Sequence, residues 1–109
     1  MALVVWFMLA AITWPTAGTA QAQEVGSAER GLQRAREACA DCHLVVKEAG
    51  RSTIPGAPAF ATVAMTPGLT RAALTAMLQT SHRTMPNVVI EGRDMNDIAA
   101  YILSLKERD

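Results

Sequence analysis

The chain has 109 residues and only two cysteines, and both cysteines lie within the five residues Cys39-Ala40-Asp41-Cys42-His43. This C-x-x-C-H order is the attachment signature for c-type haem. Two thiols about one helical turn apart can reach the two vinyl groups on one edge of a porphyrin, and the imidazole that follows is held below the iron. The motif predicts one haem c, bound covalently through Cys39 and Cys42, with His43 as an iron ligand. A chain this small needs such a group to complete its core.

Three other kinds of site use the same residue types. A thioredoxin-like redox pair also has C-x-x-C, but that fold expects a strand before the motif, and none is visible here. A zinc site needs four ligands; the motif supplies three, and His82 could supply the fourth. A short structural disulfide would suit an oxidising compartment. The haem interpretation is favoured because c-type haem attachment and protein export go together, and the chain begins with an export signal.

That signal covers residues 1–22. Residues 1–14 carry no charge, and an almost unbroken apolar run covers 2–12, which is shorter than the about 20 residues that span a bilayer. Ala20-Gln21-Ala22 has the small-x-small pattern of a signal-peptidase site. A signal peptide usually has a Lys or Arg before its apolar run, and none is present here. The alternatives to a cleaved signal peptide are therefore a buried N-terminal helix and an uncleaved anchor. We expect a signal peptide cleaved after Ala22, a mature domain over 23–109 in the periplasm, and no stable membrane span after cleavage.

Met85 is the predicted second axial ligand of the iron. It lies in the loop Thr84-Met85-Pro86-Asn87, where the proline stiffens the chain and biases Met85 towards an extended backbone. A methionine is more often core filler, but a polar loop that contains proline argues against that role. His82 is the competing ligand. The methionines in or beside predicted helices are interpreted as packing residues: Met65, Met77 and Met95.

The rest of the mature chain predicts an all-α domain. Helices are expected over 28–40 with Ser27 as N-cap, from Pro58 to before Thr66, over 71–80 with Thr70 as N-cap, and from about Arg93 to the end. The segment 45–57 contains Gly50, Pro55 and Gly56 and is expected to be irregular. No stretch shows the sustained alternation of a strand.

Charge excludes one class of partner. Ten basic and ten acidic residues give a net charge of zero, whereas a nucleic-acid-binding domain has a clear basic excess. Between Cys42 and Ile90 the charged residues are Lys47, Glu48, Arg51, Arg71 and Arg83. This local positive excess is either a solvated surface or a docking face for redox proteins with acidic surfaces.

With these residues in place, the mature chain resembles the class I cytochrome c family along nearly its whole length. The resemblance is closest to small bacterial monohaem members, through Met85-Pro86-Asn87 and Tyr101-Ile102-Leu103-Ser104-Leu105. It implies about four short helices wrapped around the haem, with the N- and C-terminal helices crossing where Gly31 meets Tyr101. It also implies a proline carbonyl that accepts a hydrogen bond from the proximal histidine. Pro55 is the best match, Pro58 is the second choice, and Phe60 is expected on the haem edge.

Two positions depart from the family pattern. An aromatic residue often found one turn before the first cysteine is Ala35 here, and the mature chain has no tryptophan to bond a haem propionate. The segment 51–53, Arg51-Ser52-Thr53, could serve that purpose instead. Neither departure threatens the expected fold.

The resemblance and the ligand set together imply an electron carrier. An iron with histidine and methionine ligands has no open position for a small-molecule substrate, and no catalytic pair of residues is visible. We expect a soluble carrier of single electrons between periplasmic redox proteins. The alternatives are a haem-bearing subunit of a dehydrogenase or oxidase complex, and a gas sensor in which Met85 gives way to the ligand.

Overall fold

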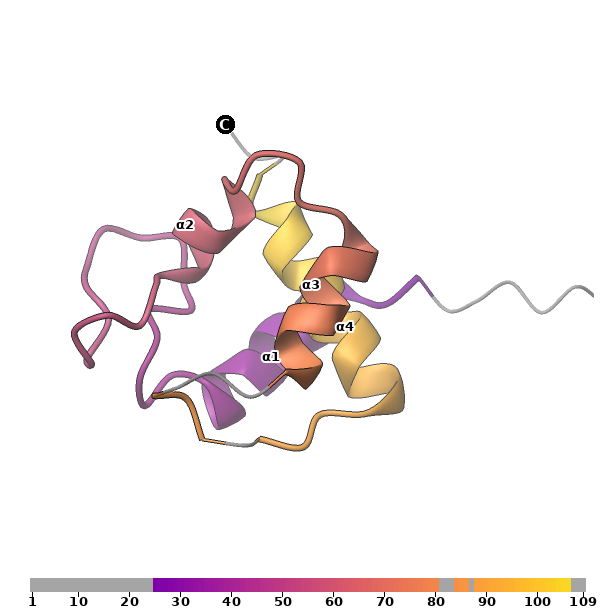
Figure 1. Cartoon of the computed structure of the whole chain (residues 1–109), viewed down its shortest axis with the longest axis horizontal. Coiled ribbons are helices and arrows are strands. Elements are labelled where there is room, and N and C mark those ends of the chain that lie inside the picture. Colours follow the sequence, from indigo (N-terminus) through magenta and orange to yellow (C-terminus); the bar gives the residue numbers. More distant parts are fainter. Residues whose placement is uncertain (1–24, 81–83, 87, 107–109) are drawn as a thin grey trace, which may run out of the picture.

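The computed structural model describes residues 25–80, 84–86 and 88–106, which form helices and no strand (Figure 1). The expected all-α fold is therefore confirmed for the described residues. The expected signal peptide over 1–22 lies outside these ranges, as do His82, Arg83 and Asn87. The helices are α1 (Ala28–Ala38), α2 (Phe60–Ala64), α3 (Arg71–Gln79) and α4 (Gly92–Ser104).

Two helices begin at the predicted N-caps. The Ser27 hydroxyl accepts a hydrogen bond from the Arg30 N–H at 3.3 Å, and the Thr70 hydroxyl accepts one from the Ala73 N–H at 3.1 Å. Each bond satisfies a backbone donor that the first turn of a helix leaves without a partner. Helix α2, in contrast, begins at Phe60 and not at Pro58, because its N-cap Ala59 has an extended backbone.

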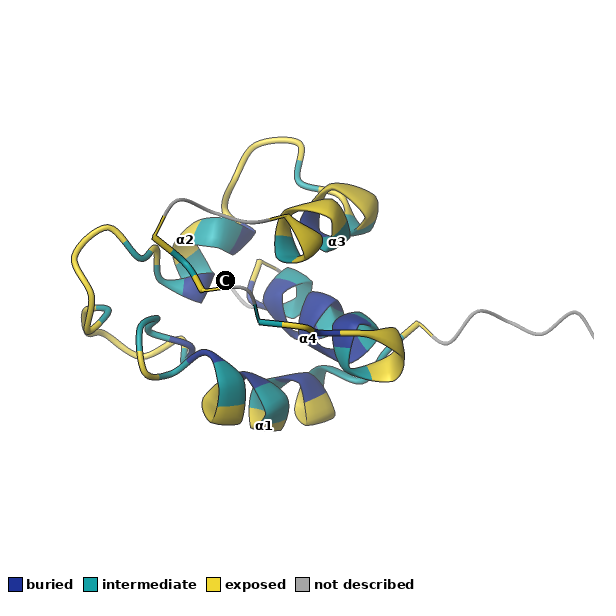
Figure 2. Ribbon diagram, turned by 60° about the horizontal axis from the view of Figure 1, so that its bottom comes forward, coloured by how far each residue is buried: buried dark blue, intermediate teal, exposed yellow. Residues whose placement is uncertain are grey.

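Helices α1 and α4 cross at the predicted glycine. A Cβ built at Gly31 would overlap the Asp97 carbonyl group and lie 2.7 Å from the Tyr101 Cβ. Only a residue without a side chain lets the two backbones approach this closely. Figures 1 and 2 show α1 lying across α4, and Figure 2 shows that the buried residues of the two helices face each other. The crossing joins the two ends of the described chain into one unit.

A buried carboxylate strengthens this crossing. Asp97 of α4 is 2% exposed. One of its oxygens accepts from the Ser27 N–H at 2.6 Å, and its two oxygens accept from Arg30 Nη2 at 2.9 Å and Nε at 2.7 Å. The guanidinium group holds the pKa of Asp97 below its usual range. Asp97 therefore ties the start of α1 to the middle of α4.

The hydrophobic core lies between α4 and the three other helices. Leu74, Ile98 and Ile102 are its most completely buried large side chains. Tyr101 extends the core towards the irregular segment, because its hydroxyl donates to the Val45 carbonyl at 2.6 Å. Figure 2 shows the inward faces of the helices as buried, while the loops between them are mostly exposed.

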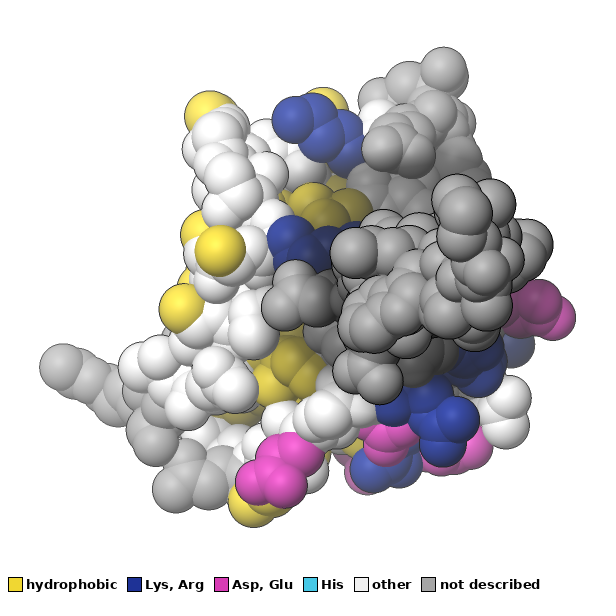
Figure 3. Space-filling view, turned by 90° about the vertical axis from the view of Figure 1, so that its right-hand side faces the viewer, with side chains coloured by type: hydrophobic (Ala, Val, Ile, Leu, Met, Phe, Trp, Pro, Cys, Tyr) yellow, Lys and Arg dark blue, Asp and Glu magenta, His cyan; other side chains and the backbone are white. Residues whose placement is uncertain are grey.

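The surface beside the crossing carries charges of both signs. Ion pairs join Arg30 to Asp97 at 2.7 Å, Arg34 to Asp94 at 2.9 Å, and Arg34 to Glu37 at 3.2 Å. Figure 3 shows acidic and basic side chains interleaved on the lower part of one side of the molecule. No helix among the described residues is long and apolar enough to cross a membrane.

Candidate functional site

The C-x-x-C-H motif forms a tight turn directly after α1. The Cys39 N–H still donates to the Ala35 carbonyl at 2.8 Å. The Cys39 carbonyl then accepts from the Cys42 N–H at 3.2 Å and from the His43 N–H at 2.9 Å. This turn places all three chemically distinctive side chains at the end of α1, at the edge of the core.

These side chains line a cavity of about 380 Å³ that is partly open to solvent. Cys39, Cys42 and His43 line it, and Met85 reaches the same cavity from a loop more than forty positions further along the chain. The remaining lining is mainly apolar and includes Phe60, Val63, Leu74, Met77, Leu78, Val88 and Ile102. The structure therefore brings together the four residues predicted to attach the haem and to hold its iron.

The His43 ring is oriented by a hydrogen bond to a proline carbonyl. Its Nδ1 lies 2.7 Å from the carbonyl oxygen of Pro58, so Nδ1 carries the proton and donates. The lone pair of a neutral imidazole is then on Nε2, which leaves Nε2 as the metal ligand. The expectation for Pro55 as the acceptor is wrong, and the second choice, Pro58, takes the role. Pro55 lies in the turn 53–56 and does not line the cavity, whereas Pro58 does.

Phe60 supports the histidine from within the core. Its ring centroid lies 5.6 Å from that of His43 and 6.5 Å from that of Tyr101, with both pairs tilted by about 50°. Its side chain is 5% exposed and also lines the cavity. The predicted position of Phe60 at the edge of a bound haem is compatible with this placement.

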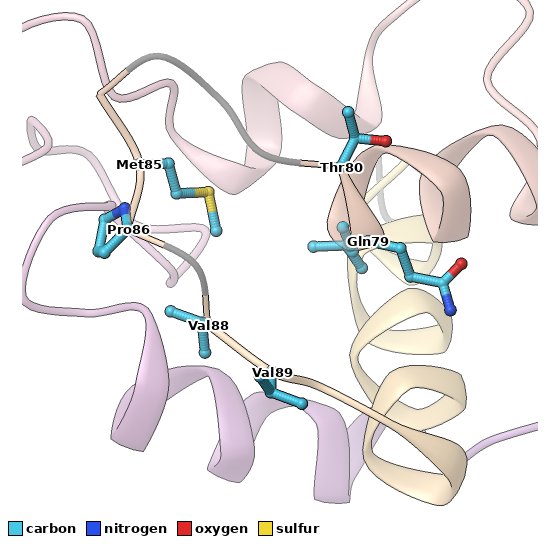
Figure 4. A pocket seen from close by; sticks show the side chains of 7 residues that line it. Gln79, Thr80, Met85, Pro86, Val88 and Val89 are labelled. Carbon is cyan, nitrogen blue, oxygen red and sulfur yellow. The ribbon is translucent and has the colours of Figure 1, made fainter.

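Met85 lies between two cavities. Besides the larger one, it lines a second cavity of about 320 Å³ with Pro86, Val88, Val89 and residues 78–80 at the end of α3. Figure 4 shows the Met85 side chain pointing from its loop into the space towards α3. The Met85 thioether therefore lies on a loop that lines both cavities, rather than within a helix interface.

The buried position of Cys39 disfavours a redox dithiol. Both cysteines are free thiols in this structure. Burial raises the pKa of the Cys39 thiol, whereas an attacking thiol needs a lowered pKa to form the thiolate. Among the described residues, no three His, Cys, Asp or Glu side chains are grouped as a metal site. His82, the fourth ligand of the zinc alternative, lies outside these residues.

The structure revises the roles of two methionines and a serine. Met95 is buried, as expected, but Met65 is 57% exposed and does not act as a packing residue. Met77 is 41% exposed and lines the larger cavity. Ser52, which the sequence suggests only as a hydrogen-bond partner of a haem propionate, accepts a hydrogen bond from the Leu44 N–H at 3.0 Å. Nothing local in the sequence signals this bond, because eight residues separate its partners.

The described basic residues of the positive excess, Lys47, Arg51 and Arg71, do not gather in one patch. Lys47 and Arg51 are exposed in the irregular segment, while Arg71 begins α3 and donates to the Asn96 carbonyl at 3.3 Å. In Figures 1 and 2 that segment and the start of α3 lie on different sides of the molecule. Any electrostatic steering of a partner by these described residues is therefore diffuse.

One curated protein is similar to this chain over most of its length. The chain is 34% identical to cytochrome c-552 of Bradyrhizobium diazoefficiens over 79 residues, which cover 72% of this chain and 75% of the relative. No family model matches the chain, and no solved structure matches it. A 34% identity over 75% of the relative shows that the two proteins belong to one family. This result agrees with the C-x-x-C-H motif that lines the cavity of this chain. The chain belongs to the c-type cytochromes, which are electron carriers rather than enzymes.

Proposed function

We propose that this chain is a class I monohaem cytochrome that carries single electrons between periplasmic redox proteins. In this proposal Cys39 and Cys42 attach one haem c, and His43 and Met85 are the axial ligands. One observation carries the proposal: both thiols, the imidazole and the Met85 thioether line the same apolar cavity. The signal peptide over 1–22 remains part of the proposal, because export would deliver the chain to the periplasm.

The residues of the cavity fit a haem in three respects. The lining is largely apolar, as a porphyrin face requires, and the cavity is partly open to solvent, which would leave part of a bound haem accessible to a partner. The hydrogen bond to Pro58 fixes the tautomer of His43 and makes its Nε2 a stronger ligand. The two cysteines follow each other at one helical turn, so both can form thioether bonds to one porphyrin edge.

Electron transfer follows from what the protein groups do. Bound haem supplies a one-electron iron couple. His43 Nε2 and the Met85 sulfur would occupy both axial positions, so no position is left for a substrate, and the thioether favours the reduced form. The surrounding side chains, such as Phe60 and Leu74, exclude water from the cavity walls. Partners are redox proteins, with weak steering towards acidic surfaces by Lys47 and Arg51.

Met85→Ala tests the ligand assignment. Wild-type protein, matured with its haem, is expected to show sharp reduced α and β bands and the weak long-wavelength band of ferric iron bound by methionine. Met85→Ala should lose that weak band while keeping the covalently bound haem, and its reduction potential should fall because the thioether is gone. Visible spectra and redox titration measure both effects.

Two matched variants show which methionine acts. Met65→Ala changes an exposed methionine that lines neither cavity, so its spectrum and potential should match the wild type. Met77→Ala changes the other methionine of the larger cavity and should keep the weak band. Loss of the band in Met77→Ala but not in Met85→Ala would move the ligand role to Met77. A colourless wild-type protein would contradict the haem proposal itself.

A further inference from the structure

The backbone on both sides of His43 is tied to the loop that follows it. The Cys42 carbonyl accepts from the Ile54 N–H at 3.3 Å. The Leu44 carbonyl accepts from the Phe60 N–H at 2.9 Å, and the Leu44 N–H donates to Ser52 Oγ at 3.0 Å. His43 is thus held between neighbours whose polar groups are paired with the segment 52–60.

Ser52 differs from the other partners in one respect. Ile54 and Phe60 contribute backbone N–H groups, which every substitution except proline keeps, whereas Ser52 contributes a side-chain hydroxyl oxygen. The loop also closes over Leu44, because a Cβ built at Gly50 would lie 3.4 Å from both Leu44 methyl groups. The Ser52 hydroxyl is thus a side-chain partner of the Leu44 backbone, and a substitution can remove it.

The bond to Ser52 acts on the peptide group that links His43 to Leu44. This group is planar, so fixing the direction of the Leu44 N–H fixes the backbone rotation at the His43 Cα. That rotation sets the direction of the His43 side chain relative to the segment 52–60. The hydrogen bond from Nδ1 to the Pro58 carbonyl at 2.7 Å requires this direction, because Pro58 belongs to the same segment. We propose that Ser52 is a positioning residue that sets the orientation of His43 and thereby the reduction potential.

The direction of the effect follows from the chemistry of the ring. A strong Nδ1–H bond to a carbonyl makes Nε2 more basic, and a more basic ligand stabilises ferric iron. Without the Ser52 hydroxyl, His43 can turn and the bond to Pro58 weakens. The ferric form then loses stabilisation, so the reduction potential rises. This inference rests on the proposed ligation of iron by His43.

Valine and threonine at position 52 provide the test. The two side chains have the same shape, but only threonine keeps a hydroxyl oxygen. A comparison of Ser52→Val with Ser52→Thr therefore isolates the effect of the hydroxyl from the effect of the added volume. In protein matured with its haem, Ser52→Val should raise the potential, shift the hyperfine-displaced NMR signals of the His43 ring and speed hydrogen exchange at the Leu44 amide. Ser52→Thr should stay close to the wild type in all three measurements.

Ser104→Ala is the control, because it removes a hydroxyl that bonds the Tyr101 carbonyl at 2.7 Å in α4. It should leave the potential unchanged even if stability falls. If Ser52→Val and Ser52→Thr had equal reduction potentials and equal His43 signals, the positioning role of Ser52 would be overturned. The iron–methionine band would still be present in that case, so the ligation proposal would stand. Absence of that band from the wild type as well would instead contradict the ligation proposal, and the inference with it.

Discussion

Gly31→Ala is expected to lower the melting temperature of the haem-loaded protein by at least about 12 °C. The new methyl group would overlap the Asp97 carbonyl and lie 2.7 Å from the Tyr101 Cβ. Both groups are fixed in the α4 backbone or at its Cβ, so no side-chain rotation relieves the overlap and the helices must separate. Overpacking of this kind costs about 3 kcal/mol, and each kcal/mol corresponds to roughly 4–8 °C in a domain of this size.

Gly50→Ala is the matched control for this prediction. It makes the same chemical change, but the new Cβ would meet only the two Leu44 methyl groups at 3.4 Å, and these can move. Thermal unfolding followed by circular dichroism should therefore show little change for Gly50→Ala. If Gly31→Ala were as stable as Gly50→Ala, the close crossing of α1 and α4 would be wrong.

Asp97→Asn is expected to destabilise the domain by about 2–3 kcal/mol at neutral pH. The carboxylate accepts three hydrogen bonds, from the Ser27 N–H and from two nitrogens of Arg30. Asparagine has one acceptor oxygen and no charge, so part of this set is lost within a site where Asp97 itself is almost fully buried. Arg30 is half exposed, which keeps the effect at the lower end of the range for buried pairs.

The loss should depend on pH in a definite direction. The Arg30 guanidinium lowers the pKa of Asp97 in the folded protein, relative to about 3.9 in an unfolded chain. The stability from the ionised carboxylate is therefore fully present above about pH 4 and is lost as the pH falls through the folded pKa. The wild type should approach Asp97→Asn in stability at strongly acidic pH.

Chemical denaturation of both proteins between neutral and strongly acidic pH measures this convergence. Asp94→Asn is the control, because Asp94 pairs with Arg34 at 2.9 Å but its side chain is 49% exposed. Exposed pairs contribute little, so this variant should follow the wild type at every pH. A constant gap between the wild type and Asp97→Asn down to the lowest pH would contradict the role of the ionised carboxylate.

Local sequence pattern was enough to predict four helices and part of the cavity lining. The N-caps Ser27 and Thr70 directly precede the helices that they cap, so α1 and α3 were predicted within two residues of their observed ends. The C-x-x-C-H spacing and the loop proline after Met85 are also local, and they identified four residues that line the cavity: Cys39, Cys42, His43 and Met85.

The features that were missed depend on contacts between distant residues. The buried role of Asp97 requires Arg30, which lies 67 positions earlier, and the apolar stripe of the last helix gave no sign of it. The choice between Pro55 and Pro58 depends on where the irregular segment turns, because either proline could reach His43 by counting alone. The bond from Leu44 to Ser52 has the same origin.

The crossing of α1 and α4 also limits when the two helices can pack and when a haem can be attached. Helix α4 is the last of the described helices to leave the ribosome, and α1 cannot bury Gly31 before Asp97 and Tyr101 exist. Cys39, which is 7% exposed in the folded domain, is therefore more accessible while the chain is still unfolded. Attachment of haem at that thiol, which the proposed export places after translocation, is easiest before α1 and α4 pack together.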